Sequence, residues 1–176
     1  MLLNNTYIGL HLEGESGKIV RSCLESYTEL ENVHPVKIPH LTLDYFGSIH
    51  SDTLKNLALG TRVMLLIANR ARNAAPITLW IPEHLVSNTT GEDIIYLPAE
   101  IENWLFDHLQ YQWYSIQTPH VTLLKWKNLT ENQIMKTLEA LEKIIPPWSL
   151  SMNMKEIFCH GKTERWDRVV KWYACV

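Results

Sequence analysis

The residues best suited to chemistry lie in two short stretches that are nearly identical. Pro39-His40-Leu41-Thr42-Leu43 returns eighty positions later (120 − 40) as Pro119-His120-Val121-Thr122-Leu123. Successive side chains of a strand point to opposite faces, so the His and Thr of each copy share one face and the aliphatic residues share the other. We therefore expect two strands that each present an imidazole and a hydroxyl beside a packed core.

These four side chains are suited to acid–base chemistry on a phosphate. A neutral imidazole accepts a proton, an imidazolium donates one, and both forms exist near neutral pH. Two histidines facing one cleft could divide the work, one deprotonating an attacking hydroxyl or water and the other protonating a leaving oxygen. The threonine hydroxyls could hydrogen-bond the non-bridging phosphate oxygens. The set needs no metal or cofactor. The structural alternative is a pair of core histidines.

The elements that must position the motifs follow an order that occurs twice. In the first half we expect a strand, a turn, a helix, the first motif strand ending at Gly47, a second helix with Ser51 as N-cap, and a hairpin. Apart from the motif, these elements are predicted over Thr6–Glu13, Gly14–Gly17, Lys18–Glu31, Asp52–Asn69, and the strand pair Ile77–Val86 and Glu92–Leu97, joined by a turn over Ser87–Gly91.

The second half repeats helix, motif strand, helix and strand pair. The last of its helices begins with Thr130-x-x-Gln133, a capping-box pattern. Its elements are predicted over Ala99–Trp113, the second motif, Glu131–Ile145, and the strands Asn153–Cys159 and Val169–Val176, with Gly161–Asp167 turning between them. Such a repeat predicts an α+β fold of two similar lobes, each an antiparallel sheet backed by helices. Because the connections are short, we expect one domain over residues 1–176. We also expect a monomer.

The paired His-x-Thr segments resemble the signatures of the 2H phosphoesterase superfamily, especially its LigT-like branch. Their flanks agree, since Leu43-Asp44-Tyr45-Phe46-Gly47 resembles the aromatic-Gly ending after the first motif and Leu124-Lys125 the aliphatic-basic ending after the second. The segment from Arg165 to Trp172 is similar to the closing segment of the family, with Trp166 where many members carry Tyr. The motif segments match closely, and the remainder of the chain matches in element order.

This resemblance implies a bilobal fold, with the motifs facing each other across a central cleft, and metal-independent chemistry on ribonucleotide phosphodiesters. Members of the family open 2′,3′-cyclic phosphates, join or cut 2′-5′ RNA linkages or, in viral branches, degrade cyclic oligonucleotide immune signals such as cGAMP. The resemblance does not choose among these substrates.

Three aromatic residues are candidates for substrate binding. Tyr7 shares a strand face with Gly9, whose small size would leave room for a ligand, although Tyr7 also fits a half-buried edge position. Trp126 falls on the face of His120 if its strand stays regular and could stack a base, whereas a core Trp is the alternative. Trp166, in the final turn, could sandwich a base.

Other polar residues carry weaker signals. Lys125, Lys127, Arg165 and Arg168 could steer an anionic substrate, although charged residues at strand ends are commonly only solvated. The remaining histidines lack metal-ligand spacing, and we expect structural or surface roles for them. They are His11, His34, His50, His84, His108 and His160.

Composition limits the partners. The formal net charge of -3 argues against a protein that tracks long nucleic acid, which would need many Lys and Arg. The three cysteines are odd in number and far apart, as in reduced cytosolic proteins. The N-terminus turns polar early and no apolar stretch is long enough to span a bilayer. We expect a cytoplasmic protein without membrane contact, in the host cytoplasm if viral, acting on a small nucleotide.

The leading hypothesis is a metal-independent phosphodiesterase that uses His40, Thr42, His120 and Thr122 on a cyclic dinucleotide or a short 2′-5′ oligonucleotide. If the source is viral, removal of a host cyclic nucleotide signal, and hence immune evasion, is the natural role. The alternative is an RNA 2′,3′-cyclic phosphodiesterase or 2′-5′ RNA end-processing enzyme. A non-catalytic nucleotide-binding module and a His-rich metal hydrolase are the more distant readings. The residues leave open which His is the acid and which the base.

Overall fold

The computed structural model describes residues 1–12, 14–25, 33–72, 77–87, 90–100, 119–145, 151–152, 156–163 and 168–174. The helices within these ranges are α1 (Gly14–Glu25), α2 (Ser51–Arg72) and α4 (Glu131–Ile144). The strands are β1 (Leu2–His11), β2 (Val33–Pro35), β3 (His40–His50), β4 (Ile77–Leu79), β5 (Glu83–Val86), β6 (Asp93–Glu100), β7 (His120–Trp126), β8 (Ser151–Met152), β9 (Glu156–Lys162) and β10 (Arg168–Ala174).

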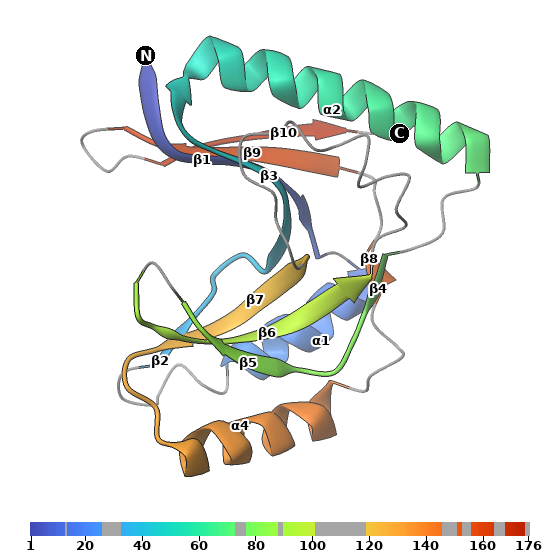
Figure 1. Cartoon of the computed structure of the whole chain (residues 1–176). Helices are drawn as coiled ribbons and strands as arrows, with labels where there is room; N and C mark the ends of the chain where they lie inside the picture. The colour runs from blue at the N-terminus through green and yellow to red at the C-terminus, as the bar shows by residue number, and fades with distance from the viewer. Residues whose placement is uncertain are drawn as a thin grey trace.

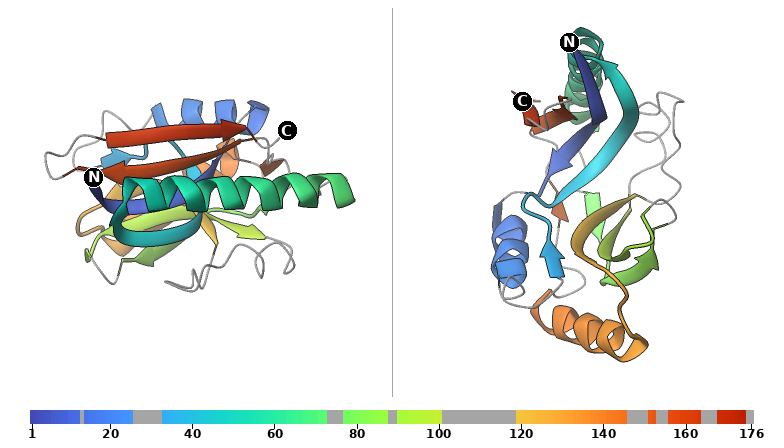
Figure 2. Two further views of the ribbon diagram at one scale, coloured as in Figure 1. Left: turned by 90° about the horizontal axis from the view of Figure 1, so that it is seen from above. Right: turned by 90° about the vertical axis from the view of Figure 1, so that its left-hand side faces the viewer.

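The strands form two antiparallel lobes, as the repeat predicts. The strand order is β10-β9-β1-β3-β7-β6-β4-β8, with β2 paired to β7 and β5 paired to β6. In the first lobe, α2 packs on the sheet of β10, β9, β1 and β3. In the second lobe, α1 contacts β7 and α4, and α4 contacts β5. Figure 1 and the right-hand view of Figure 2 show α2 and α4 at opposite ends of the molecule, with the sheets between them. The α+β bilobal fold is therefore confirmed.

The two lobes meet where the motif strands touch. Within the described part of the chain, β3 and β7 pair through one pair of residues, Leu41 and Val121. Both side chains are fully buried. Each belongs to a motif, so the junction of the lobes lies in the middle of both motifs.

Each lobe combines segments from both halves of the chain. The C-terminal hairpin β9–β10 joins the first motif's lobe by pairing with β1, whereas the hairpin β5–β6, from the first half, joins the second motif strand β7. Helix α1 also lies in the second lobe. Each half of the chain thus contributes a hairpin to the lobe of the other half, an exchange of hairpins that the repeat does not predict. An alternating pattern shows that a strand pairs but does not show which sheet edge it joins.

The start of α1 differs from the prediction. The expected turn over Gly14–Gly17 is wrong, because these residues form the first turn of the helix. A Cβ atom at Gly17 would lie 2.3 Å from the carbonyl oxygen of Leu12. Glycine thus allows the helix to begin directly against the end of β1. The end of the predicted helix, residues 26–31, lies outside the described residues.

Several predicted strands have other limits. The expected strand Ile77–Val86 is two strands, β4 and β5, interrupted at residues 80–82, where Pro82 lacks the N–H that a ladder needs. Ala99, predicted to start a helix, belongs to β6 instead, and residues 101–113 lie outside the described residues. Strand β3 continues past Gly47, which has a φ of +66°, to His50.

The C-terminal part also differs in detail. Strand β9 extends to Lys162, so that Gly161 is a strand residue and does not begin the turn. Residues 164–167 of the predicted turn lie outside the described residues. The short strand β8, which pairs with β4, was not predicted.

The capping box of α4 and the hairpin turn are confirmed, whereas Ser51, predicted as an N-cap, is the first residue of α2 itself. The Thr130 hydroxyl accepts a hydrogen bond from the Gln133 backbone N–H, and the Gln133 side chain accepts one from the Thr130 backbone N–H, at 3.4 and 2.9 Å. In the hairpin turn, Gly91 has a φ of +65° and its N–H donates to the Ser87 carbonyl at 2.8 Å. These local patterns need no tertiary partner, which explains why they are readable from sequence.

The core is mostly aliphatic and continuous across both lobes. It contains leucines and isoleucines from β1, β3, β6, β7 and β9, together with Cys23 and Cys159. Burial raises the pKa of the Cys23 thiol to about 11, so this cysteine is an inert packing residue near neutral pH. Cys175 lies outside the described residues. None of the described helices combines the length and apolar character that a membrane span requires.

Candidate active site

The motif strands repeat each other in burial, residue by residue. His40, Thr42, His120 and Thr122 are half-buried, whereas Leu41, Val121 and Leu123 are fully buried and Leu43 nearly so. Both strands thus place the imidazole and the hydroxyl on one face and the aliphatic residues in the core, as the period of two predicts.

Each motif strand also carries a β-bulge at the same position. Along β1 and β3, Gly9 pairs with Thr42 and Ile8 with Asp44, so Leu43 is the extra residue. Along β6 and β7, Tyr96 pairs with Thr122 and Ile95 with Leu124, so Leu123 is the extra residue. A bulge places two consecutive side chains on the same side and shifts the alternation beyond it.

This shift corrects the expected position of Trp126. Because of the bulge at Leu123, both Leu123 and Leu124 are buried, and Lys125 rather than Trp126 returns to the motif face. Trp126 is 6% exposed and belongs to the core cluster. The prediction that Trp126 stacks a base is therefore wrong, since it assumed a regular strand.

The register at the junction arranges the four motif residues crosswise. Antiparallel strands run in opposite directions, so with Leu41 opposite Val121, His40 lies toward Thr122 and Thr42 toward His120. The two histidines are then diagonal neighbours, which lie about 7–8 Å apart in a regular pair. The register thus brings both motif histidines to the junction of the two lobes.

The hydrogen bonding of His40 fixes its tautomer. Its Nδ1 lies 2.7 Å from the Ile38 carbonyl oxygen, which can only accept, so Nδ1 carries the hydrogen. The lone pair of neutral His40 is therefore on Nε2. The ring stacks on Tyr7, with centroids 4.9 Å apart, and meets Phe158 edge-on at 5.2 Å. These contacts hold the imidazole in one orientation.

The surroundings of His40 favour its neutral form. Burial lowers its pKa to about 4, helped by the positive charges of His160, His11 and Lys125, while the bond to Ile38 opposes this shift. A neutral imidazole with its lone pair on Nε2 can accept a proton, which is the property of a general base.

Tyr7 lies between two imidazoles. His160 belongs to β9, which pairs with β1 at the edge opposite β3. Its ring stacks on the Tyr7 ring, with centroids 4.7 Å apart. The Nδ1 of His160 lies 3.2 Å from the carbonyl oxygen of Asn5, a residue with a φ of +51°. Tyr7 thus supports His40, and the two imidazoles leave little of its ring face for a base.

The expected space over Gly9 is filled. A Cβ atom at Gly9 would lie 3.0 Å from the ring of Phe158, which is 2% exposed. The Leu41 carbonyl oxygen would lie even closer, at 2.9 Å. Gly9 therefore makes room for the neighbouring strand β3 and for Phe158, rather than for a ligand.

His120 has an aromatic neighbour of its own. The Tyr96 ring meets it at 68°, with centroids 5.2 Å apart. The Tyr96 hydroxyl donates a 2.8 Å hydrogen bond to Glu83. Burial and the Glu83 carboxylate raise the pKa of Tyr96 to about 12, so the hydroxyl stays protonated. Each motif histidine is thus held by a tyrosine from the neighbouring strand.

A cavity of about 410 Å³ adjoins His40 and is lined by residues of both lobes. Its wall consists of Asn5, Tyr7, His34, Pro35, Val36, Lys37, Ile38, His40, Lys125, Phe158, His160 and Lys162. Of the predicted binding residues, Tyr7 lines it, Trp126 does not, and Trp166 lies outside the described residues. Of the predicted steering cations, Lys125 lines it, whereas Lys127 is exposed elsewhere.

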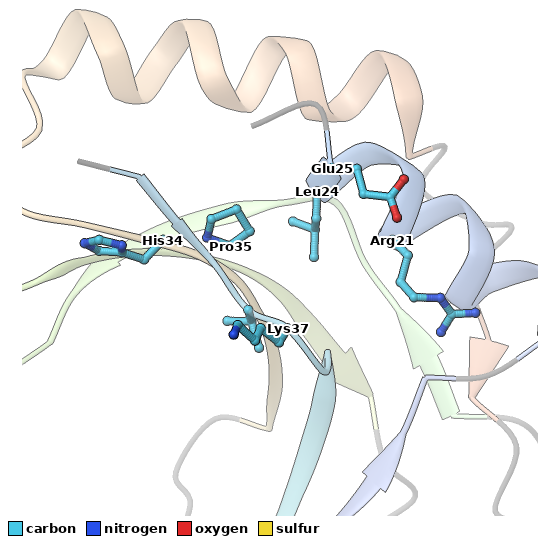
Figure 3. A pocket seen from close by; sticks show the side chains of 7 residues that line it. Arg21, Leu24, Glu25, His34, Pro35 and Lys37 are labelled. Carbon is cyan, nitrogen blue, oxygen red and sulfur yellow. The ribbon is translucent and has the colours of Figure 1, made fainter. Parts of the chain in front are cut away.

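Several wall residues were not predicted. His34 lies directly opposite Lys125 in the pairing of β2 with β7, and the wall residues Phe158, His160 and Lys162 alternate along β9. The alternation of these three residues is visible in the sequence. Only the pairing of β9 with β1, however, places them near His40. Residues His34–Lys37 also line a second cavity of about 430 Å³, with Arg21, Leu24 and Glu25 of α1 on its other wall (Figure 3).

The histidines near the site do not form a metal-binding group. His11, opposite His40 in the β1–β3 pairing, and His160 both lie near His40. Among the described residues, no three His, Cys, Asp or Glu side chains converge as metal ligands would.

Solved structures with a similar fold include E. coli LigT. Its apo form is 16% identical, with 99% of this chain and 98% of that chain covered and a TM-score of 0.56. The chain has the LigT fold. The complex of E. coli LigT with 3′-AMP aligns with a TM-score of 0.55, at 16% identity over 99% of this chain and 98% of that one. The protein TT0787 of Thermus thermophilus aligns over 97% of each chain, at 17% identity and a TM-score of 0.58.

These likenesses confirm the fold that the His-x-Thr resemblance implied, at identities that show the fold alone. No protein-family model matches the chain. A search of curated proteins gave no match either.

Proposed function

We propose that the protein is a metal-independent phosphodiesterase acting on small ribonucleotides. The observation that carries this proposal is the crosswise arrangement of two His-x-Thr motifs around the Leu41–Val121 pair, each followed by a bulge and with His40 at the edge of a cavity. The LigT fold supports it, as do the complexes of E. coli LigT with 3′-AMP and ATP.

In the proposed reaction, His40 is the general base. Its Nε2 takes the proton of the attacking oxygen, which belongs either to water or to a ribose 2′-hydroxyl, as the new P–O bond forms. His120 protonates the leaving oxygen as the old P–O bond breaks. Thr42 and Thr122 donate hydrogen bonds to the non-bridging oxygens, whose charge grows in the transition state. The neutral state and tautomer of His40 support this division.

The test is a product assay in EDTA. The substrates are 2′3′-cGAMP, 3′3′-cGAMP, a 2′-5′ oligoadenylate and 2′,3′-cyclic mononucleotides. We expect turnover of at least one of them, and His40→Ala and His120→Ala should each lower kcat by at least about 100-fold, the usual size of one acid–base contribution. Activity that chelator abolishes would instead support a metal hydrolase.

The matched control is His50→Ala, which removes an exposed histidine from the far end of β3 and should leave turnover unchanged. Thermal unfolding of all variants shows whether the fold is kept. Full activity of a folded His40→Ala or His120→Ala protein would contradict the proposed mechanism. Tight nucleotide binding without turnover would favour the binding-module alternative.

Opening of 2′,3′-cyclic phosphates at RNA ends is the second candidate. It is favoured by the 3′-AMP bound to E. coli LigT, because opening of a 2′,3′-cyclic phosphate at its 2′ oxygen leaves a 3′-phosphate. The product assay separates this candidate from cleavage of cyclic dinucleotides, including the cGAMP role expected of a viral source.

A further inference from the structure

The wall of the cavity beside His40 is strongly basic. Lys37, Lys125 and Lys162 line it together with His34 and His160. No Asp or Glu lines it within the part of the chain that the structure describes. The whole protein has a net charge of -3, so this concentration of cations is a local feature and does not reflect the composition.

The lysines and histidines of the wall come from both lobes and lie largely on strands. Lys125 of β7 and Lys162 of β9 are both half-buried, so their stems are held against the wall. His34 of β2 lies directly opposite Lys125, and His160 precedes Lys162 by two residues on the same strand face. An anion in this space would thus have positive charge on opposite sides.

The proposed chemistry does not require this charge. The scissile phosphate is served by the His and Thr residues of the motifs. Lysine and histidine side chains that line a half-buried space from several sides favour an anionic ligand there. The cavity volume also lies in the range of small-molecule sites and exceeds what one phosphate group fills.

We propose that this cavity binds a second phosphate group of the substrate, held by Lys125 and Lys162 with Lys37 at the exposed rim. The inference rests on the proposed function and narrows its substrate class. A dinucleotide with two linking phosphates qualifies, as does a 5′-phosphorylated oligonucleotide. A 2′,3′-cyclic mononucleotide without a further phosphate uses only the catalytic half of the site.

The test compares substrates that differ by one phosphate group. The first pair is adenosine 2′,3′-cyclic phosphate with and without a 5′-phosphate, and the second is the 2′-5′-linked adenosine dinucleotide with and without a 5′-phosphate. With wild-type protein, the 5′-phosphate should raise kcat/KM by about tenfold or more in the pair that is cleaved, because charge-assisted hydrogen bonds to a phosphate are strong. Equal kcat/KM within a cleaved pair would overturn the inference.

If none of these substrates nor the two cGAMP isomers is turned over, the proposed function itself fails. If cleavage occurs without a preference for the 5′-phosphate, only the second phosphate site fails.

Variants of the cavity-wall lysines test whether these residues cause the preference for a 5′-phosphate. Lys125→Gln and Lys162→Gln should each lower kcat/KM about tenfold more for the 5′-phosphorylated substrate than for its unphosphorylated partner. Lys127→Gln is the matched control, because Lys127 is exposed and lies outside the cavity wall, and it should keep the wild-type preference. A preference that survives in both wall variants would contradict the assignment, and thermal unfolding verifies that the variants are folded.

Discussion

At the scale of single residues, the two motif histidines have equivalent sequence contexts but different structural environments. His40 is bonded through Nδ1 to a backbone carbonyl and contacts both a tyrosine and a phenylalanine ring. His120 meets one tyrosine edge-on. The motifs predict a shared chemistry, but the flanking strands, and not the motifs, give each imidazole its own environment.

The depressed pKa of His40 predicts the pH dependence of activity. A pKa of about 4 keeps His40 neutral, and thus able to act as base, well below the ordinary histidine value of 6.5. The acidic limb of kcat/KM should therefore lie near pH 4. The ring 15N shifts of His40, assigned with His40→Ala, should show the hydrogen on Nδ1 at pH 7. An acidic limb and an NMR midpoint near 6.5 would contradict this.

The same shift affects stability, with a definite sign. As pH falls below 6.5, this histidine binds a proton in the unfolded chain but stays neutral in the folded one until about pH 4. The unfolded state is therefore favoured progressively between these values, and the contribution of His40 to stability is lost as the pH falls.

At the scale of elements, a buried carboxylate joins three segments of the second lobe. Asp93, at the start of β6, is 7% exposed, and its Oδ1 lies 2.8 Å from Nε2 of His84 on β5. Its Oδ2 accepts a 2.8 Å hydrogen bond from the backbone N–H of Leu129, just before α4. Asp93 thus ties β5, β6 and the N-terminal end of α4 together.

We expect Asp93→Ala to lower the free energy of unfolding by about 2–3 kcal/mol, because it leaves the Leu129 N–H and the His84 ring without their carboxylate partner. Urea unfolding measures this difference. The matched control is Glu139→Ala, which removes an exposed carboxylate on α4 and should change stability by less than about 0.5 kcal/mol. If Asp93→Ala lowers the free energy of unfolding no more than the control does, Asp93 does not stabilise the junction of β5, β6 and α4.

The predictability of the elements follows from what each pattern depends on. The capping box of α4 and the alternation of the motif strands depend on nearby residues, and both are confirmed. The bulges at Leu43 and Leu123 depend on the register with neighbouring strands, so the prediction for Trp126, which required a regular strand, fails. The wall residue His160 was missed because its function depends on which sheet edge β9 joins.

At the scale of the whole molecule, the exchange of hairpins makes the two halves of the chain interdependent. We expect that fragments produced by a cut within residues 101–118 do not fold alone, because the first lacks β7, β9 and β10 and the second lacks β1, β3 and β6. Mixed or coexpressed, they should form a stable one-to-one complex with a cooperative unfolding transition. Circular dichroism and size-exclusion chromatography measure both properties. An independently folded fragment would contradict the expectation.

The interleaved order of the strands also has a consequence for synthesis in the cell. On the ribosome, β1 emerges well before its partner β9, because all the elements from α1 to β8 are made between them. During that interval its hydrogen-bonding edge is open to strands of other nascent chains. Translation speed and protection by chaperones over this interval should therefore govern the yield of native protein. A nascent chain can acquire the complete cavity wall only after β9 has emerged.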